Sequence, residues 1–118
     1  MFMQVDDVSI FNPSGELDHV DGRALLEKIR RSLSSDWRKI VIDLSQVEHI
    51  HYGILGQLWG LAEATAGSAG GIKLANVNSH NRQILILTGM DRRFETYDSV
   101  ADAVLSFQNP LLRPGRLH

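Results

Sequence analysis

Hydrophobic residues along this chain form two patterns: short β-branched runs, and longer stretches in which apolar positions recur every three or four residues. Runs of the first kind occur at residues 8–11, 40–44, 72–77 and 94–97. Such runs, bounded by turn residues, predict strands. Almost every residue of 40–44 is apolar, which indicates a central strand in a sheet that is covered on both faces.

Four stretches have the apolar spacing of a helix, and three of them follow a residue suited to cap a helix N-terminus. They cover residues 21–33, 53–66, 79–88 and 100–107, with Asp18 or Asp21, Asn78 or Ser79, and Ser99 as the caps of the first, third and fourth. Because strands and helices alternate, we expect a mostly parallel sheet with right-handed crossovers. The sequence therefore predicts an α/β fold: a single-domain sandwich with a small, mostly parallel β-sheet and about four α-helices.

Length and composition fit one domain with a buried core. The chain has 118 residues, of which 43% are hydrophobic. We predict that residues 1–108 form the domain and that 109–118 form a flexible tail. The net charge of −2 leaves no electrostatic footprint for nucleic acid. No apolar run approaches the ~20 residues that span a bilayer, and the first residues lack a signal peptide, so we expect a cytoplasmic protein.

Catalytic and metal-binding chemistry has little support in this sequence. The absence of cysteine excludes disulfides, thiol catalysis and cysteine-type zinc sites. Asp43 is better explained as a turn or capping residue than as a catalytic acid. His49 and His51 would share one face of an extended segment near Glu48, but no third ligand accompanies them. No arrangement of nucleophile, base and orienting group is visible, so we predict no enzyme activity, no metal site and no cofactor.

The stretch from residue 39 to residue 61 is the most informative part of the chain. A predicted buried strand at 40–44 leads through a predicted surface loop at 45–53 into the helix that follows. This arrangement places free backbone N–H groups and the positive end of a helix dipole at one point of the surface. In many α/β proteins, such a point binds ligands, phosphates or partners.

Four segments, in order and at matching spacing, resemble one known family. They are GELD at 15–18, IVIDLSQV at 40–47, AGGIKLANV at 69–77 and LILTGMDRRF at 85–94. Together they resemble the STAS domains, a family that includes bacterial anti-sigma-factor antagonists, over about residues 8–107. The resemblance implies a non-enzymatic protein-interaction module that acts in signal transduction and transcription regulation.

The chain departs from that family in the loop before the second helix. The family signature there is aspartate–serine–serine–glycine–leucine–glycine, whereas residues 51–56 read HYGILG and match only at the last two positions. His51 replaces the aspartate and can cap the helix weakly. Gly53 stands where regulated antagonists carry the phosphoacceptor serine, and it has no hydroxyl group. The usual phosphorylation switch therefore cannot operate at this position, and Tyr52 is a poor substrate for a serine kinase.

The resemblance implies a partner-binding surface made by this loop, the start of the second helix and its exposed side. The residues predicted for it are His49, His51, Tyr52, Gly53, Ile54, Leu55, Gly56 and Trp59. Leu55 and Trp59 would form an apolar patch, although Trp59 is equally well explained as packing under a neighbouring helix. The implied partner is an anti-sigma factor or a related kinase, bound constitutively or under another form of control.

Two other functions remain open at this stage. Related STAS domains serve as cytoplasmic subunits of transport systems, including lipid-trafficking ABC transporters, and there the partner would be an ATPase subunit. The same loop could instead sense a small ligand or a metal ion. Weak homodimerisation through exposed apolar helix faces is compatible with each of these functions.

Overall fold

The computed structural model describes residues 2–5, 7–34, 39–65 and 71–109 of the chain. Its elements, in order, are β1 (Phe2–Val5), β2 (Val8–Phe11), β3 (Ser14–Leu17), α1 (His19–Ser34), β4 (Lys39–Asp43), β5 (Gln46–Ile50), α2 (Tyr52–Thr65), β6 (Gly71–Ala75), α3 (Ser79–Thr88), the short 3₁₀ helix η2 (Met90–Arg92), β7 (Thr96–Tyr97) and α4 (Val100–Gln108). Apart from Asn109, the predicted tail lies outside the described residues.

Five strands form the main sheet in the order β1-β2-β4-β6-β7. The pairs β2–β4, β4–β6 and β6–β7 are parallel, and β1 is antiparallel to β2 at one edge. The predicted α/β fold with a mostly parallel sheet and about four helices is confirmed. The edge strand β1 was not predicted, because its short segment carries no alternating pattern that distinguishes it from a disordered N-terminus.

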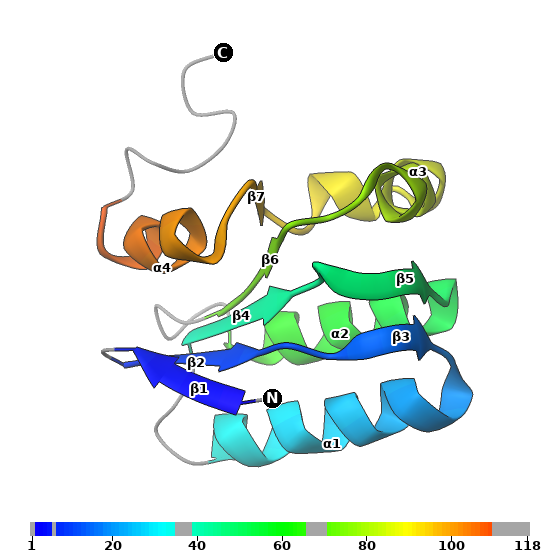
Figure 1. Cartoon of the computed structure of the whole chain (residues 1–118). Helices are drawn as coiled ribbons and strands as arrows, with labels where there is room; N and C mark the ends of the chain where they lie inside the picture. Colours follow the sequence, from blue (N-terminus) through cyan, green and yellow to red (C-terminus); the bar gives the residue numbers. More distant parts are fainter. Residues whose placement is uncertain (1, 6, 35–38, 66–70, 110–118) are drawn as a thin grey trace.

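A second, two-stranded sheet continues the centre of the first. Strand β3 follows β2 and strand β5 follows β4 after a short break, and β3 and β5 pair in parallel (Figure 1). The prediction of a surface loop at 45–53 is therefore wrong for residues 46–50. Val47 and Ile50 of this strand are each only 1% exposed, so burial of apolar side chains holds the segment in the fold. Each strand ends directly before a helix, β3 before α1 and β5 before α2.

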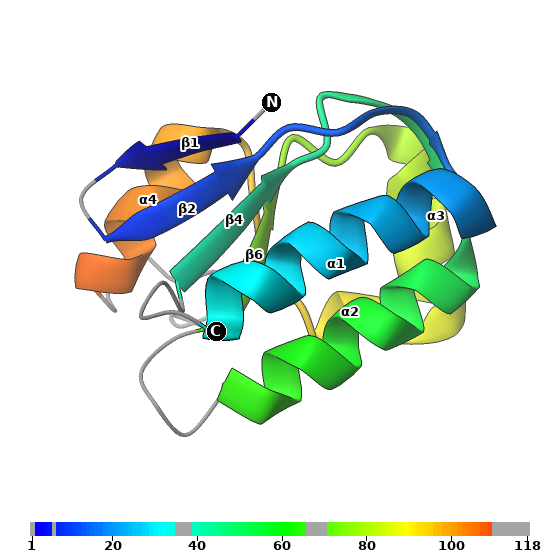
Figure 2. The ribbon, with the colours of Figure 1, turned by 90° about the horizontal axis from the view of Figure 1, so that it is seen from below.

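Helices cover both faces of the main sheet, as the apolar character of β4 predicted. Figure 2 shows α1 and α2 side by side across one face, where Ile29, Leu58 and Ile40 belong to the larger core cluster. Helix α4 covers the other face, where Val104 packs in a smaller cluster with Val41. Successive residues of β4 thus enter different cores, which explains why the strand has no polar side.

Asp18 caps helix α1. Its carboxylate accepts hydrogen bonds from the backbone N–H groups of Asp21 and Val20, each at 3.0 Å. These two N–H groups lower the pKa of Asp18 below its ordinary value. Of the two caps suggested by the sequence, the structure therefore selects Asp18, and Asp21 lies inside the first turn of the helix.

We expect Asp18→Ala to destabilise the fold at pH 7 and to have little effect in strong acid. The carboxylate has a lower pKa in the folded chain than in the unfolded chain. Its contribution to stability is present above the unfolded-state pKa and is lost as the pH falls through the folded-state pKa. Urea unfolding of both proteins at pH 7 and near pH 2 measures the difference. A loss that stays constant between the two pH values would contradict the prediction, and Asp21→Ala is the matched control.

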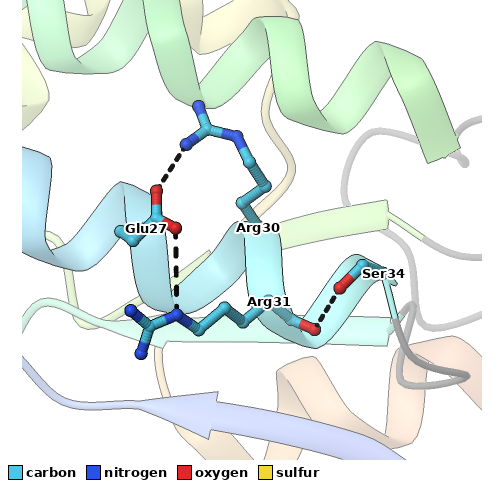
Figure 3. Close-up of polar contacts among 4 residues, drawn as sticks. All are labelled: Glu27, Arg30, Arg31 and Ser34. Carbon is cyan, nitrogen blue, oxygen red and sulfur yellow. Dashed lines mark hydrogen bonds and ion pairs between the residues drawn. The ribbon is translucent and has the colours of Figure 1, made fainter.

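The solvent-exposed side of α1 is charged and internally paired. Glu27 accepts from the Arg30 guanidinium at 2.7 Å and lies 3.8 Å from that of Arg31, as Figure 3 shows. Ser34 donates its hydroxyl proton to the carbonyl of Arg31 at 2.9 Å. This is an ordinary solvated helix surface. The neighbouring α2 differs from it, because it carries no charged residue before Glu63.

Candidate functional site

The candidate site lies at one end of the domain, where β3 and β5 finish and the helices α1 and α2 begin (Figure 2). The backbone N–H of His51 donates to the carbonyl of Leu17 at 3.0 Å and so ties the end of β5 to the end of β3. His19 opens α1, and its ring lies 4.6 Å from the ring of His51, centroid to centroid. The two helix N-termini are thus held next to each other.

His51 occupies the N-cap position of α2, as the sequence suggested it could. Its Nδ1 atom accepts the hydrogen bond of the Gly53 backbone N–H at 3.1 Å, and its carbonyl accepts from the N–H of Ile54 at 3.0 Å. The ring stacks on Tyr52 at a centroid distance of 4.6 Å. A Cβ atom on Gly53 would lie 3.2 Å from His51 Nδ1, so the glycine leaves room for this cap.

His49 projects toward helix α3 rather than toward His51. Its Nδ1 atom lies 2.8 Å from Nε2 of His80, which is the second residue of α3. A shared face for His49 and His51 requires an extended segment, whereas β5 ends at Ile50 and His51 already belongs to the start of α2. In the part of the chain that the structure describes, no group of three His, Asp or Glu residues is placed to hold a metal ion.

Two asparagines attach α3 to the outer edge of β5. Asn78 caps α3 by accepting from the N–H of Asn81 at 2.7 Å, and its amide donates to the carbonyl of Val47 at 3.1 Å. Asn81 is fully buried; its Oδ1 accepts from the N–H of Ile50 and its Nδ2 donates to the carbonyl of Val47, both at 3.0 Å. The predicted N-cap role of Asn78 is confirmed.

Sequence reasoning missed Asn81, His80 and His19 as members of this site. A signal for Asn81 does exist, because it lies one helical turn before the buried Leu85 and so falls on the apolar face of α3. A polar amide at such a position needs internal partners. No comparable signal marks the two histidines, whose contacts join separate elements.

The side of α2 that faces solvent is free of charge along most of its length. We call the exposed or half-exposed residues Tyr52, Gly53, Gly56, Gln57 and Gly60 the α2 outer face. Tyr52 is 67% exposed, and a Cβ atom added at Gly56 or Gly60 would meet nothing within 4 Å. The first charged residue of the helix is Glu63. Of the predicted binding residues, Tyr52, Gly53 and Gly56 lie on this face.

Ile54 and Leu55 are corrections to the predicted binding surface. Both side chains are 0% exposed, so neither can contact a partner in this structure. Ile54 packs against α1 so closely that a Cβ atom on Gly22 would lie 2.5 Å from its Cδ1 atom. Leu55 belongs to the same core cluster. More of the α2 surface is buried than its apolar spacing predicts, because the helix packs against α1, α3 and the main sheet.

Trp59 is half-buried and packs against the core. Its ring meets that of Phe94 edge-on at a centroid distance of 5.8 Å, and the guanidinium of Arg93 lies 5.3 Å from the ring centroid. The packing interpretation of Trp59 therefore accounts for its contacts better than an exposed apolar patch. Asp43, as predicted, has a turn role: its Oδ1 accepts from the Ser45 N–H and the Asn76 amide, each at 3.0 Å.

No helix in the described residues is long and apolar enough to cross a membrane. The sequence profile of the STAS domain matches residues 2–103. A candidate anti-sigma factor antagonist of Thermotoga maritima is 31% identical over 102 residues, which cover 85% of this chain and 89% of that protein.

Solved structures give the same result. A candidate anti-sigma factor antagonist from Thermotoga maritima superposes with a TM-score of 0.84 at 27% identity, covering 92% of this chain and 94% of that one. An anti-sigma factor antagonist from Mycobacterium paratuberculosis has a TM-score of 0.81 at 28% identity, with 92% of each chain covered. The profile match, the relative and these structures agree with the four segments singled out from the sequence. The chain belongs to the STAS domain family.

Proposed function

We propose that this chain is a non-enzymatic interaction module of the anti-sigma-factor-antagonist kind, which binds an anti-sigma factor or a related kinase through the α2 outer face. The observation that carries this proposal is the exposed, uncharged surface of α2 beside the paired N-termini of α1 and α2. The similarity to anti-sigma factor antagonists supports the class of partner.

The glycines of the α2 outer face support close approach by another chain. A glycine in a helix costs roughly 1 kcal/mol relative to alanine, and neither Gly56 nor Gly60 makes room for anything among the residues that the structure describes. A flat helix surface of this kind lets a partner backbone come near. Tyr52 stands at its edge as an exposed aromatic anchor, a residue type enriched where binding energy concentrates.

Control of this binding cannot follow the serine mechanism. Gly53 offers no hydroxyl group at the phosphoacceptor position, and the residue before it is a tyrosine. Binding through the α2 outer face is therefore independent of phosphorylation at residue 53. Localisation in the cytoplasm and weak self-association both stay predictions.

We expect Gly56→Arg to weaken partner binding about tenfold or more, because it places a long, charged side chain in the middle of the docking surface. The site is open and helical, so the substitution leaves the fold intact. The tagged chain and this variant are purified from native cells, and the captured proteins are identified by mass spectrometry. The control is Ala101→Arg, which makes the same kind of change at an exposed position of α4 on the other side of the sheet.

The identity of the captured protein separates the functions. An anti-sigma factor or kinase that is lost in Gly56→Arg but retained in Ala101→Arg supports the proposal. An ATPase or permease subunit would assign the chain to a transport system instead. If Gly56→Arg and Ala101→Arg captured equal amounts of the same partner, the α2 outer face would not be the docking surface.

A further inference from the structure

All four histidines in the described residues lie in two contact pairs at the candidate site. The chain has five histidines, and the fifth, His118, lies outside those residues. His19 and His51 have ring centroids 4.6 Å apart, and Nδ1 of His49 lies 2.8 Å from Nε2 of His80. The pairs join β5 and the N-termini of three helices, one of which, α2, carries the proposed docking surface.

The observed contacts need an unprotonated Nδ1 on His51 and at least one unprotonated nitrogen across the His49–His80 contact. Nδ1 of His51 accepts the Gly53 N–H at 3.1 Å, so the proton of the neutral ring is on Nε2. A second proton would occupy Nδ1 and remove the cap. Across the 2.8 Å contact of His49 with His80, one nitrogen donates and the other accepts. Two charged rings would present two donors and two like charges at that distance.

Helix ends and polar side chains surround the rings. His51, His19 and His80 lie at the starts of α2, α1 and α3, the positive ends of the helix dipoles. Four acidic or phenolic groups face or flank the pairs: the Asp18 carboxylate interacts with His19, Tyr52 stacks on His51, Glu16 is the register partner of His49 on β3, and Glu48 precedes His49. These groups do not restore the acceptor that the Gly53 N–H loses when His51 Nδ1 carries a proton.

We propose that the two histidine pairs form a proton-operated switch at the site where the serine switch is missing. Histidine is the side chain whose charge changes between about pH 5 and 8. Protonation of His51 Nδ1 removes the cap of α2, protonation of both His49 and His80 separates those two rings, and each added proton places positive charge near the start of α2. The structural switch is independent of any partner, whereas its effect on binding rests on the function proposed above.

The test follows the Gly53 amide by NMR in the ¹⁵N-labelled full chain between pH 8 and pH 5.5, with a chelator present so that no metal ion bridges the rings. We expect the Gly53 resonance to titrate together with the His51 ring. We also expect its hydrogen-exchange protection factor to fall about fivefold, the equivalent of a lost helix cap. A Gly53 amide that is indifferent to pH in the wild-type chain would overturn the proposal.

Two variants identify the group that responds. His51→Asn keeps a cap acceptor that does not titrate, so the Gly53 amide should become independent of pH while the fold is retained. His80→Asn removes only the second pair and leaves the Gly53 response in place. Unchanged titration of Gly53 in His51→Asn would also overturn the switch.

Partner capture at the two pH values then separates the proposals. Capture that depends on pH in the wild-type chain but not in His51→Asn supports the switch as a regulator of binding. A Gly53 response without any captured partner would contradict only the proposed function. Capture that is unaffected by pH despite the Gly53 response would show that the switch does not control binding.

Discussion

Replacing Asn81 with leucine should destabilise this protein by about 3 kcal/mol, because it removes two buried hydrogen bonds and leaves a buried donor without a partner. Leucine has a similar shape, so loss of packing contributes little. Asn81 is 0% exposed, and its amide group satisfies the Ile50 N–H and the Val47 carbonyl at the edge of β5 that does not pair with β3. The Val47 carbonyl keeps the hydrogen bond from the Asn78 amide, whereas the Ile50 N–H loses its acceptor, Asn81 Oδ1.

The consequence reaches the candidate site through the backbone. Ile50 is the residue before His51, so the amide of Asn81 holds the end of β5 from which the α2 cap begins. We expect Asn81→Leu to lower the melting temperature by about 10 °C or more, measured by circular dichroism. It should also lower hydrogen-exchange protection in β5 and at the start of α2 more than elsewhere.

Gln83→Leu is the matched control for this prediction. It makes a similar change at an exposed position of the same helix and should alter stability by less than about 0.5 kcal/mol. Equal stabilities for the two variants would mean that water or a backbone shift replaces the asparagine amide. In that case the attachment of α3 to β5 would rest on apolar packing, with Leu85 as its buried residue.

The parts of the fold that the sequence predicted are those in which one periodic signal dominates. Strands β2, β4 and β6 are runs of apolar residues, and the helices α1, α3 and α4 combine an apolar face with a recognisable cap. Strand β5 lacks such a signal. Exposed and buried residues alternate only from Gln46 to Glu48, and the alternation breaks at the half-buried His49, next to the register shift. The partner strand β3 contains a turn-forming glycine. Pairing between segments thirty residues apart cannot be seen in local patterns.

Helix α2 shows why the predicted binding surface includes residues that the structure buries. Three of the five residues of its outer face are glycines and none is charged, so its apolar and exposed sides differ little in hydropathy. Leu55 was therefore assigned to the surface, whereas in the structure it is buried in the core. The histidine contacts could not be predicted, because each joins two elements whose relative position depends on the fold.

The second large effect is expected at Lys73, a charged residue buried under α4. Its ammonium group donates to the Ser106 hydroxyl at 2.7 Å, lies 3.1 Å from the Glu95 carboxylate, and lies 4.1 Å from the centroid of the Phe107 ring. Tyr97 donates its hydroxyl proton to the same carboxylate at 3.1 Å. Side chains of Lys73 and Glu95 are 11% and 23% exposed, so water screens this pair only weakly.

Lys73→Met should destabilise the fold by about 3 kcal/mol, because it keeps the aliphatic stem but leaves the Glu95 carboxylate partly buried without its cation. The double variant Lys73→Met with Glu95→Gln should recover a large part of that loss, because the uncompensated charge is then gone. Urea unfolding of the wild type, both single variants and the double variant gives the coupling energy directly. Additive losses in the two single variants would contradict the prediction and would assign the cost to altered packing around Phe107. A large coupling energy would mean that the α4 side of the sheet is stabilised by this ion pair as well as by apolar contacts. That side of the core is then stabilised separately from α2, so substitutions on α2 can be tested for their effect on binding.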